Sequence, residues 1–215
     1  ITKHLISKFS VESIYKINTE LPIKLDQICR NINCKLIHIS TDCVFDGKKK
    51  LYNESDIPNA IDLYGVSKAN SENLKFSSII RTSTIGYEIN NKFGLLEWFL
   101  DQSESCLGYT KAIFSGITTI ELGNIIDSYF LKKNELLGLY NISSQPIDKF
   151  SLLNLFKIHY RKKIDIFPDE SFEINRSLLN EKFINETNYE SKSWKMMLNE
   201  MDDFLKVNSN TIISN

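Results

Sequence analysis

The chain has 215 residues, of which 42% are hydrophobic and 25% charged, with a formal net charge of −1. This length and composition suit a globular protein of one domain or slightly more. The near-zero charge argues against a nucleic-acid partner and against binding to an anionic membrane surface, and no apolar run could span a bilayer. Four cysteines without a C-x-x-C pair, and three scattered histidines, favour free thiols in the cytoplasm and no metal site.

Residues 19–33 are the first segment with a clear periodicity, and they predict an amphipathic helix. Polar residues, among them Asp26, occupy one side of this helix. The other side carries the apolar residues Leu21, Ile23, Leu25, Ile28, Cys29 and Ile32.

Strand-like and helical segments alternate over the rest of the first 90 residues. The sequence KLIHIS, at 35–40, predicts a strand that is buried on both faces. A loop at 45–63, a helix at 63–76 and a strand at 77–86 are expected to follow. This alternation predicts βαβ units, and therefore a parallel sheet with helices on both faces.

The second half is less regular and suggests a smaller α+β lobe from about residue 86. Ser151 is expected to cap the second half of one of its helices, and Pro168 to end one of its strands. The predicted elements are helices at 93–102, 118–133, 148–160 and 193–206, and strands at 138–143 and 162–169.

Polar residues at the end of the strand at 35–40 are candidates for a site. In an open parallel sheet, ligands bind beyond the carboxyl ends of the strands, where Ser40, Thr41 and Asp42 are expected. Tyr64 and Lys68 lie one helical turn apart, so both project from one helix face. An ammonium near a phenol lowers the phenol pKa, so we expect Lys68 to lower that of Tyr64. A tuned tyrosine beside a hydroxyl suits acid–base chemistry on a carbonyl or an alcohol.

The sequence STDCVFDG, followed by YNESDIPNAIDLYGVSKANSE and IIRTS, closely resembles the extended short-chain dehydrogenase/reductases. Within them it looks most like the dTDP-4-dehydrorhamnose reductase group. The resemblance continues through GYTKAIFSGITTIELGNII and GLYNIS to NRSLLNEKFINETNYESKSWKMMLNEM. It implies a partial Rossmann-type doubly wound parallel sheet, NADPH or NADH as cofactor, a nucleotide-sugar substrate and a homodimer as the candidate assembly.

The resemblance also implies roles for individual residues. Thr41, Tyr64 and Lys68 match the catalytic set, and Asn18 matches an asparagine that orders a helix and a water relay, although it could equally be a surface residue. The residues implied in cofactor binding are Ser40, Tyr64, Lys68, Arg81, Thr82 and Ser83. Those implied in substrate binding are Asp42, Cys43, Thr84, Lys111, Ser115 and Thr118. A turn and a helix cap would explain Ser115 and Thr118 equally well.

Two positions depart from the rhamnose reductases. Cys43 stands where the group usually has an aromatic residue after STD, and Thr84 where it usually has tryptophan after RTS. These changes leave the sugar open. They fit reductases of capsule, O-antigen or deoxysugar pathways that act on other 4-keto sugar nucleotides.

The glycine loop that should hold the cofactor phosphates is not found among the eight glycines. We therefore expect residues 1–85 to be the C-terminal portion of a cofactor-binding domain whose first strands are absent. Residues 86–215 would be mainly a substrate-binding lobe, with some segments returning to the Rossmann core. A chain without those strands should expose the sheet edge and the apolar face that they cover, and should be inactive alone.

Two alternatives to a reductase remain open. One is a sugar-nucleotide epimerase or dehydratase of the same superfamily, although dehydratases typically carry Asp-Glu after the threonine, where this chain has Asp42 and Cys43. The other is a non-catalytic regulatory subunit, like that of methionine adenosyltransferase.

Overall fold

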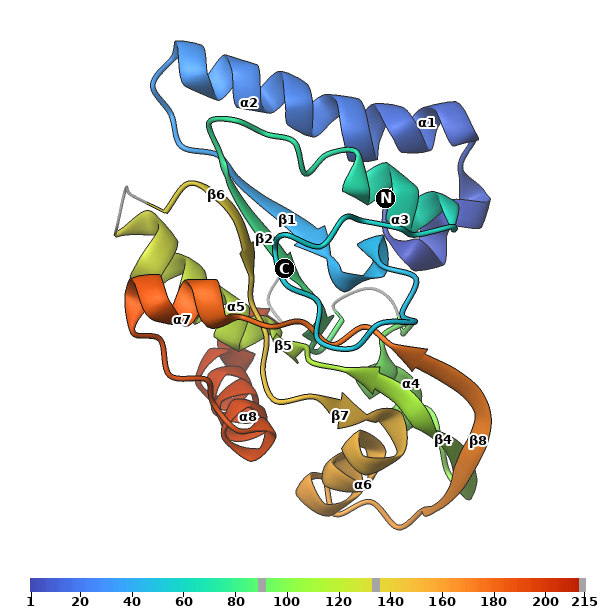
Figure 1. Ribbon diagram of the computed structural model, residues 1–215. Coiled ribbons are helices and arrows are strands. Elements are labelled where there is room, and N and C mark those ends of the chain that lie inside the picture. Colours follow the sequence, from blue (N-terminus) through green and yellow to red (C-terminus); the bar gives the residue numbers. More distant parts are fainter. Residues whose placement is uncertain (89–91, 133–135, 213–215) are drawn as a thin grey trace.

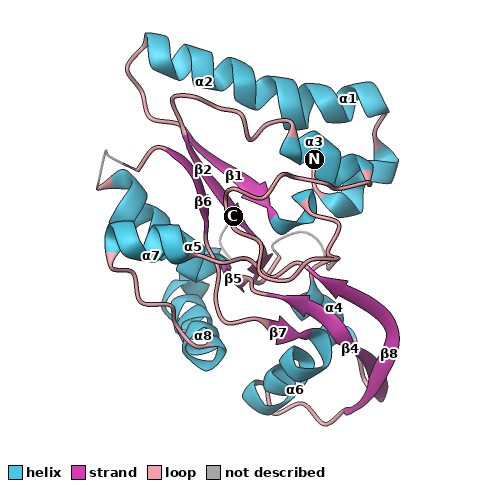
Figure 2. Ribbon diagram, in the orientation of Figure 1, coloured by secondary structure: helices cyan, strands magenta, loops and turns pink. Residues whose placement is uncertain are grey.

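The computed structural model describes residues 1–88, 92–132 and 136–212, and it has the α/β architecture with parallel sheets that the sequence predicts (Figures 1 and 2). The central sheet has the strand order β1-β2-β6, and both pairings are parallel. Its strands are β1 (Ile37–Thr41), β2 (Ser78–Thr82) and β6 (Gly138–Asn141). Thr41 pairs with Thr82, so the carboxyl ends of β1 and β2 lie side by side.

One long helical segment leads into this sheet and runs along the top of Figure 1. It follows a 3-10 helix (Lys3–Lys8) and consists of α1 (Val11–Tyr15), a π-helical turn (Lys16–Glu20) and α2 (Leu21–Asn31). Ser10 caps α1 by accepting a hydrogen bond from the Ser13 amide. The predicted helix at 19–33 is therefore confirmed.

The side of α2 that packs on the protein is not the apolar one. Asp26 is buried, and its carboxylate accepts hydrogen bonds from the Lys75 and Phe76 amides, both at 3.2 Å, and from the Ser77 hydroxyl. The exposed side carries Leu21, Leu25, Ile28 and Ile32.

In the described residues β1 pairs only with β2, so its other edge is free. The exposed edge and apolar face that the sequence predicts are thus observed.

The segment after β1 brings a short helix against the strand end. A 3-10 turn (Asp42–Val44) follows β1, then a loop, then α3 (Leu63–Ala69), which Asp62 caps and which ends before the predicted residue 76. A Cβ at Gly65 would lie 2.2 Å from the Cys43 carbonyl oxygen. Glycine at this position therefore lets α3 approach the turn after β1 closely, which places Tyr64 beside it.

A second sheet, of order β7-β4-β8, forms the lower lobe in Figure 1. It contains β4 (Ser105–Phe114), β7 (Ile147–Asp148) and β8 (Asp165–Asn175), and α6 (Lys149–His159) packs against it. The strand β4 was not among the elements predicted from the sequence. Pro168 was wrongly expected to end the strand, because β8 continues through it. In the described residues β8 pairs only with β4, so β8 has a free edge, where a missing N–H is tolerated.

Two helices of this half can be compared with what the sequence predicts for them. The Asp148 side chain accepts the Ser151 amide at 2.8 Å, so Asp148 caps α6 and the predicted Ser151 cap is wrong. The predicted helix at 118–133 is α5 (Thr119–Ile125) with a π-helical continuation (Ile126–Leu131), and its predicted last residue, Lys133, lies outside the described residues. The remaining elements are β3 (Thr84–Ile85), α4 (Leu95–Asp101), β5 (Ile117–Thr118), α7 (Glu181–Thr187) and α8 (Trp194–Ile212).

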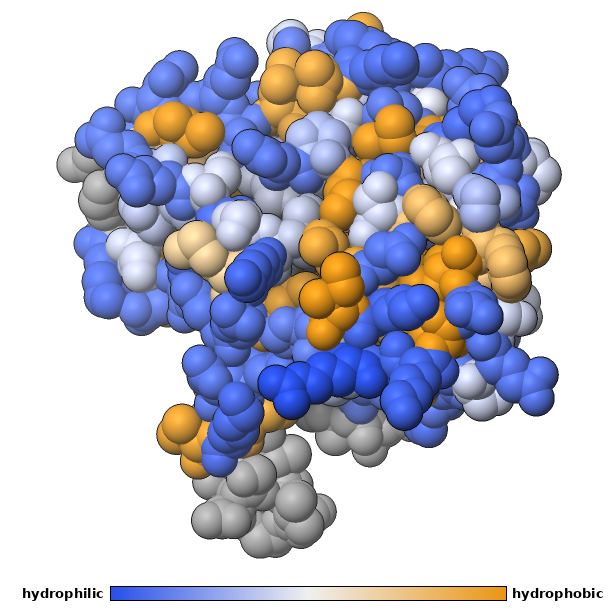
Figure 3. Space-filling model, turned by 90° about the horizontal axis from the view of Figure 1, so that it is seen from below, coloured by the Kyte–Doolittle hydropathy of each residue, from blue (hydrophilic) through white to orange (hydrophobic). Residues whose placement is uncertain are grey.

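One large hydrophobic cluster joins the central sheet to the helices of the second half. It includes Ile80 of β2, Phe156 of α6, Phe183 of α7 and Met197 of α8, all fully buried. On the face seen from below, hydrophobic patches are interspersed with hydrophilic residues (Figure 3). Among the described residues, no helix is both long and apolar enough to cross a membrane.

Candidate active site

Two adjoining cavities, each of about 480 Å³, open at the carboxyl ends of β1 and β2. The strand-end pocket is lined by Asn18, Ser40, Thr41, Tyr64, Lys68, Thr82 and Thr84, among others. The aromatic pocket is lined by Trp98, Tyr109, Phe114, Lys149, Phe172 and Arg176, among others. Lys3, Asp42, Cys43 and Ser83 line both. The two cavities therefore adjoin at these four residues, and together they are called the hollow below.

Thr41 and Tyr64 meet in the strand-end pocket. The Thr41 hydroxyl accepts the Cys43 amide at 3.2 Å, which fixes it at the start of the turn after β1. Burial and the nearby Cys43 raise the pKa of Tyr64 to about 12, and a hydrogen bond with Thr41 offsets only part of this rise. Tyr64 is therefore a protonated phenol at neutral pH, which is the form that a proton donor requires.

Lys68 projects from the same helix face but does not tune Tyr64. Its Nζ donates to the Ile39 carbonyl oxygen of β1 at 2.7 Å, and burial lowers its pKa to about 8. The Tyr64 pKa is raised through burial, and Lys68 is not among the causes of its shift. The prediction that Lys68 lowers the Tyr64 pKa is therefore wrong for this structure.

Asn18 belongs to this pocket, and the alternative of a surface residue is wrong. It is only 4% exposed, and its Nδ2 donates to the Ser67 hydroxyl of α3 at 3.1 Å. It also donates to the Ile1 carbonyl oxygen at 3.0 Å. Asn18 thus joins the π-helical turn to the helix that carries Tyr64 and Lys68.

Arg81 lies away from both pockets. It is 1% exposed and forms a two-point ion pair with Glu72, at 3.0 Å from Nε and 2.5 Å from Nη2. The Ser40 hydroxyl donates to the same carboxylate at 2.5 Å. Because Arg81 alternates along β2 with the pocket residue Thr82, its side chain points to the other face of the sheet. The structure assigns Arg81 an internal ion pair and no place beside a ligand in either pocket.

The candidates from the second lobe do not line the hollow either. Lys111 forms an exposed ion pair with Glu170 at 2.8 Å. The Ser115 hydroxyl accepts the Leu178 amide at 2.8 Å, and Thr118 caps α5 by accepting the Glu121 amide at 3.2 Å. The cap explanation is thus confirmed for Thr118. By contrast, the predicted residues Thr82, Ser83 and Thr84 do line the strand-end pocket.

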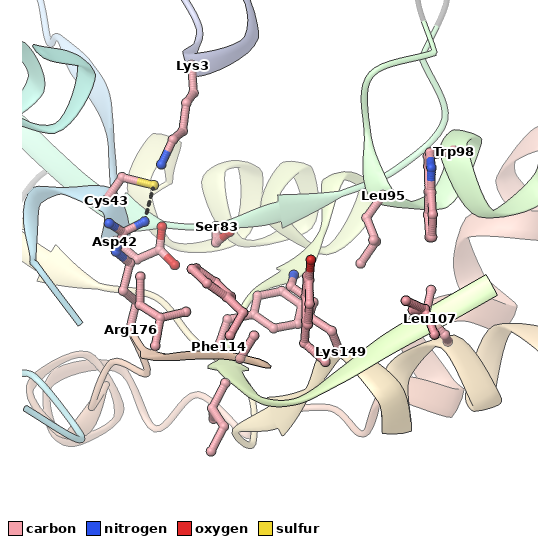
Figure 4. Close-up of a pocket in the computed structure, with 16 residues that line it drawn as sticks. Lys3, Asp42, Cys43, Ser83, Leu95, Trp98, Leu107, Phe114, Lys149 and Arg176 are labelled. Atoms are coloured by element: carbon pink, nitrogen blue, oxygen red, sulfur yellow. Dashed lines mark hydrogen bonds between the residues drawn. The ribbon is translucent and has the colours of Figure 1, made fainter. Parts of the chain in front are cut away.

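Arg176 and Lys149, which were not predicted as site residues, line the aromatic pocket together with Asp42 (Figure 4). Asp42 is buried, and burial raises its carboxyl pKa, with Arg176 and Lys149 acting in the opposite direction. The Arg176 guanidinium donates to the Phe45 carbonyl oxygen at 2.8 Å and to the Cys43 sulfur at 3.4 Å. Arg176 falls in the quoted segment NRSLL, but its position beside Cys43, far away in sequence, was not visible there.

The comparisons with known proteins agree with this geometry. Residues 9–95 match the family model described as RmlD substrate binding domain. The dTDP-4-dehydrorhamnose reductase of Aggregatibacter actinomycetemcomitans is 29% identical over 151 residues, which are 65% of this chain and 51% of that protein. Methionine adenosyltransferase 2 subunit beta of Danio rerio is 57% identical over only 37 residues, which are 17% of this chain and 12% of that protein.

The fold has solved counterparts as well. The crystal structure of dTDP-4-dehydrorhamnose reductase from Bacillus anthracis, in complex with NADP, superposes with a TM-score of 0.82 at 20% identity. The match covers 96% of this chain and 78% of that one. The chain spans about half the length of the curated reductase that it matches.

The fold is that of solved dTDP-4-dehydrorhamnose reductase structures. Over residues 9–95 the chain resembles the RmlD substrate binding domain, and over 151 residues it is similar to a dTDP-4-dehydrorhamnose reductase.

Proposed function

We propose that the protein containing this chain reduces a 4-keto sugar nucleotide, with NADPH or NADH as the reductant. The observation that carries the proposal is the convergence of Thr41, protonated Tyr64 and Lys68 in one pocket at the end of β1. We place the reaction in a surface polysaccharide, O-antigen or deoxysugar pathway.

Each of the three residues of the strand-end pocket has its own role in the proposed reduction. When bound in this pocket, a nicotinamide cofactor would supply a hydride for the sugar C4. Tyr64 donates its phenolic proton to the oxygen on C4, so the carbonyl becomes a hydroxyl, and the Thr41 hydroxyl holds that oxygen by a hydrogen bond. Lys68, held on the Ile39 carbonyl oxygen, keeps a cationic group one helical turn from Tyr64.

The pocket fits a nicotinamide cofactor by the chemistry of its donors. Lys68 can donate to ribose hydroxyls, and Thr82 and Ser83 place further hydroxyl groups at the end of β2. Arg81 is omitted from this set because Glu72 already holds it. The Bacillus anthracis relative was crystallised with NADP, which supports NADPH as the first cofactor to test.

The test uses the complete product of the gene that encodes these residues. It is incubated with 4-keto sugar nucleotides and NADPH, and both cofactor consumption and product are measured. A reductase consumes one NADPH for each 4-hydroxy product. Conversion of the sugar without net NADPH consumption would instead identify an epimerase or a dehydratase.

A regulatory subunit is distinguished by a second measurement. The same preparation is tested for a stable complex with methionine adenosyltransferase by co-purification. A stable complex together with no reduction of any keto sugar would overturn the proposal. We also propose that residues 1–215 alone are inactive, and tight NADPH binding by that segment would contradict this part.

A further inference from the structure

The C-terminal end of α2 has the backbone hydrogen bonds of a Schellman motif. The Cys34 amide donates to the Cys29 carbonyl oxygen at 2.8 Å. One residue earlier, the Asn33 amide donates to the Arg30 carbonyl oxygen at 3.2 Å. Asn33 lies in the left-handed region, with a φ of 52°. These two bonds around one left-handed residue define the motif, and they turn the chain from α2 toward β1 (Figure 1).

A Schellman motif brings two side chains together, and in this chain both of them are cysteines. The contact joins the third residue from the end of the helix to the second residue after the cap, and it is commonly apolar. In α2 these positions are Cys29 and Cys34. Burial raises the pKa of the Cys29 thiol, and Cys34 raises it further through its charge and a side-chain hydrogen bond. The two thiol groups are therefore neighbours.

These two thiols are also within reach of small molecules. Cys34 is exposed and Cys29 is partly exposed, and both are free thiols. The other two cysteines of the chain lie elsewhere, because Cys106 is buried in β4 and Cys43 lies in the hollow beside Arg176. The end of α2 therefore presents a pair of thiols that one reagent can meet together.

We propose that Cys29 and Cys34 form a reversible disulfide across the end of α2. A disulfide requires Cα atoms about 4.4 to 6.8 Å apart. The direct backbone hydrogen bond keeps the two main chains adjacent, so the bond can close with little movement of the backbone. Exposed disulfides are readily reduced, which makes this one reversible. The site lies outside the hollow, and the inference is independent of the proposed function.

The bond forms by thiol–disulfide exchange with a low-molecular-weight disulfide such as oxidised glutathione. The more exposed thiolate, that of Cys34, attacks one sulfur of the reagent and displaces one thiolate, which leaves a mixed disulfide on Cys34. The Cys29 thiolate then attacks the Cys34 sulfur, and the second thiolate leaves. In total the two cysteines lose two electrons and two protons, and the reagent is reduced to two thiols.

The disulfide would fix the connection between α2 and β1. The closed loop runs from Cys29 to Cys34 and contains Asn33, and β1 begins shortly after it at Ile37. Because the bond can close only while the end of α2 is folded back on itself, it holds Asn33 in the left-handed conformation. The redox state of the surroundings would thus control how firmly this helix end is held.

The experiment treats the complete gene product, in its folded state, with mixtures of reduced and oxidised glutathione. The remaining thiols are blocked, and tryptic peptides are analysed by mass spectrometry. Trypsin cleaves after lysine and arginine, so Cys29 lies on the peptide 25–30 and Cys34 on the peptide 31–35. We expect these two peptides to be linked, with a summed mass lower by two hydrogen atoms, and dithiothreitol should separate them. In Cys29→Ser, Cys34 should keep glutathione as a mixed disulfide.

Substitutions of Asn33 test whether the motif brings the thiols together. Asn33→Val strains the left-handed residue, so half-formation of the disulfide should need about tenfold more oxidising glutathione conditions than in wild type. Asn33→Gly, which adopts a positive φ readily, should stay within about twofold of wild type. Cys106→Ala, which removes a thiol outside the pair, should give the same linked peptides as wild type.

Two results would overturn the inference. One is a wild-type protein whose two peptides stay unlinked under oxidising conditions, including a protein in which Cys34 carries only glutathione. The other is an equal redox midpoint for Asn33→Val and Asn33→Gly, because the disulfide would then not depend on the left-handed turn.

Discussion

At the scale of single residues, burial decides the protonation states in the strand-end pocket. Tyr64 and Lys68 are both largely removed from water, and each shifts toward its neutral form, with a Tyr64 pKa of about 12 and a Lys68 pKa of about 8. The neutral phenol carries one proton, beside Thr41, that it can donate. This favours the reduction of a carbonyl, which consumes a proton, over a role that begins with a phenolate.

Tyr64→Phe tests this role directly. The substitution removes the proposed proton donor but keeps the ring. If the proposed function holds, kcat of the complete gene product should fall by a factor of about 100 to 10,000 while NADPH affinity stays almost unchanged. Steady-state kinetics and cofactor titration measure the two quantities. Tyr15→Phe, on α1 outside both pockets, is the matched control. Turnover of Tyr64→Phe like that of wild type would contradict the assignment.

His38 carries a pH effect on stability. Burial, with a smaller contribution from Lys68, lowers its pKa from 6.5 to about 4, and its Nε2 lies 2.9 Å from the Ser71 hydroxyl. The unfolded state therefore binds a proton below pH 6.5 that the folded state accepts only near pH 4. The free energy of unfolding should consequently decrease as the pH is lowered from 6.5 to 4. His38→Gln should reduce this acid sensitivity and leave stability above pH 7 nearly unchanged. Urea unfolding at several pH values measures it, and identical pH profiles would refute it.

At the scale of elements, periodicity located α2, but it did not show which side of the helix faces the protein. The apolar side is exposed along Leu21, Leu25 and Ile28, and the polar Asp26 is buried. The physical reason is hydrogen bonding, since Asp26 accepts the amides of the segment that leads into β2. A pattern of hydrophobicity carries no information about such distant donors.

Asp26→Ala should therefore destabilise the chain although it removes a charged residue from a helix. The Lys75 and Phe76 amides and the Ser77 hydroxyl would lose their acceptor, at a cost of about 3 kcal/mol in the free energy of unfolding. Denaturant unfolding measures the change. Asp127→Ala, at an exposed ion pair with Lys132, should cost less than about 1 kcal/mol. Equal effects of the two substitutions would show that Asp26 does not anchor α2.

At the scale of the whole molecule, the hydrophobic cluster that joins the central sheet to α6, α7 and α8 holds the two halves of the hollow together. The apolar side of α2 contributes nothing to this cluster. Stability should therefore depend on position in the fold and not on hydrophobicity alone.

A matched pair of substitutions tests this expectation. Ile80→Ala, at a fully buried position of β2, should reduce the free energy of unfolding by about 2 to 5 kcal/mol. Ile28→Ala, at a position of α2 that is 52% exposed, should change it by less than about 1 kcal/mol, since alanine also has the higher helix propensity. Urea unfolding of this 215-residue chain measures both. A comparable loss from Ile28→Ala would mean that the exposed side of α2 is covered in solution.

Sequence alone determined the fold class, most of the helices and the local pair Tyr64 and Lys68, because these depend on periodicity and on spacing within one helix. It also indicated Thr41 and Asp42 at a strand end, since strand order is encoded in the βαβ alternation. Arg81 shows where such reasoning stops. Its position at the end of β2 was evident, but a buried partner, Glu72, takes its charge. Only the tertiary structure decided that Lys149 and Arg176 lie beside Asp42, and that Trp98, Tyr109 and Phe172 form the facing wall. These residues come from five separate segments, and their distances depend on how the two lobes pack.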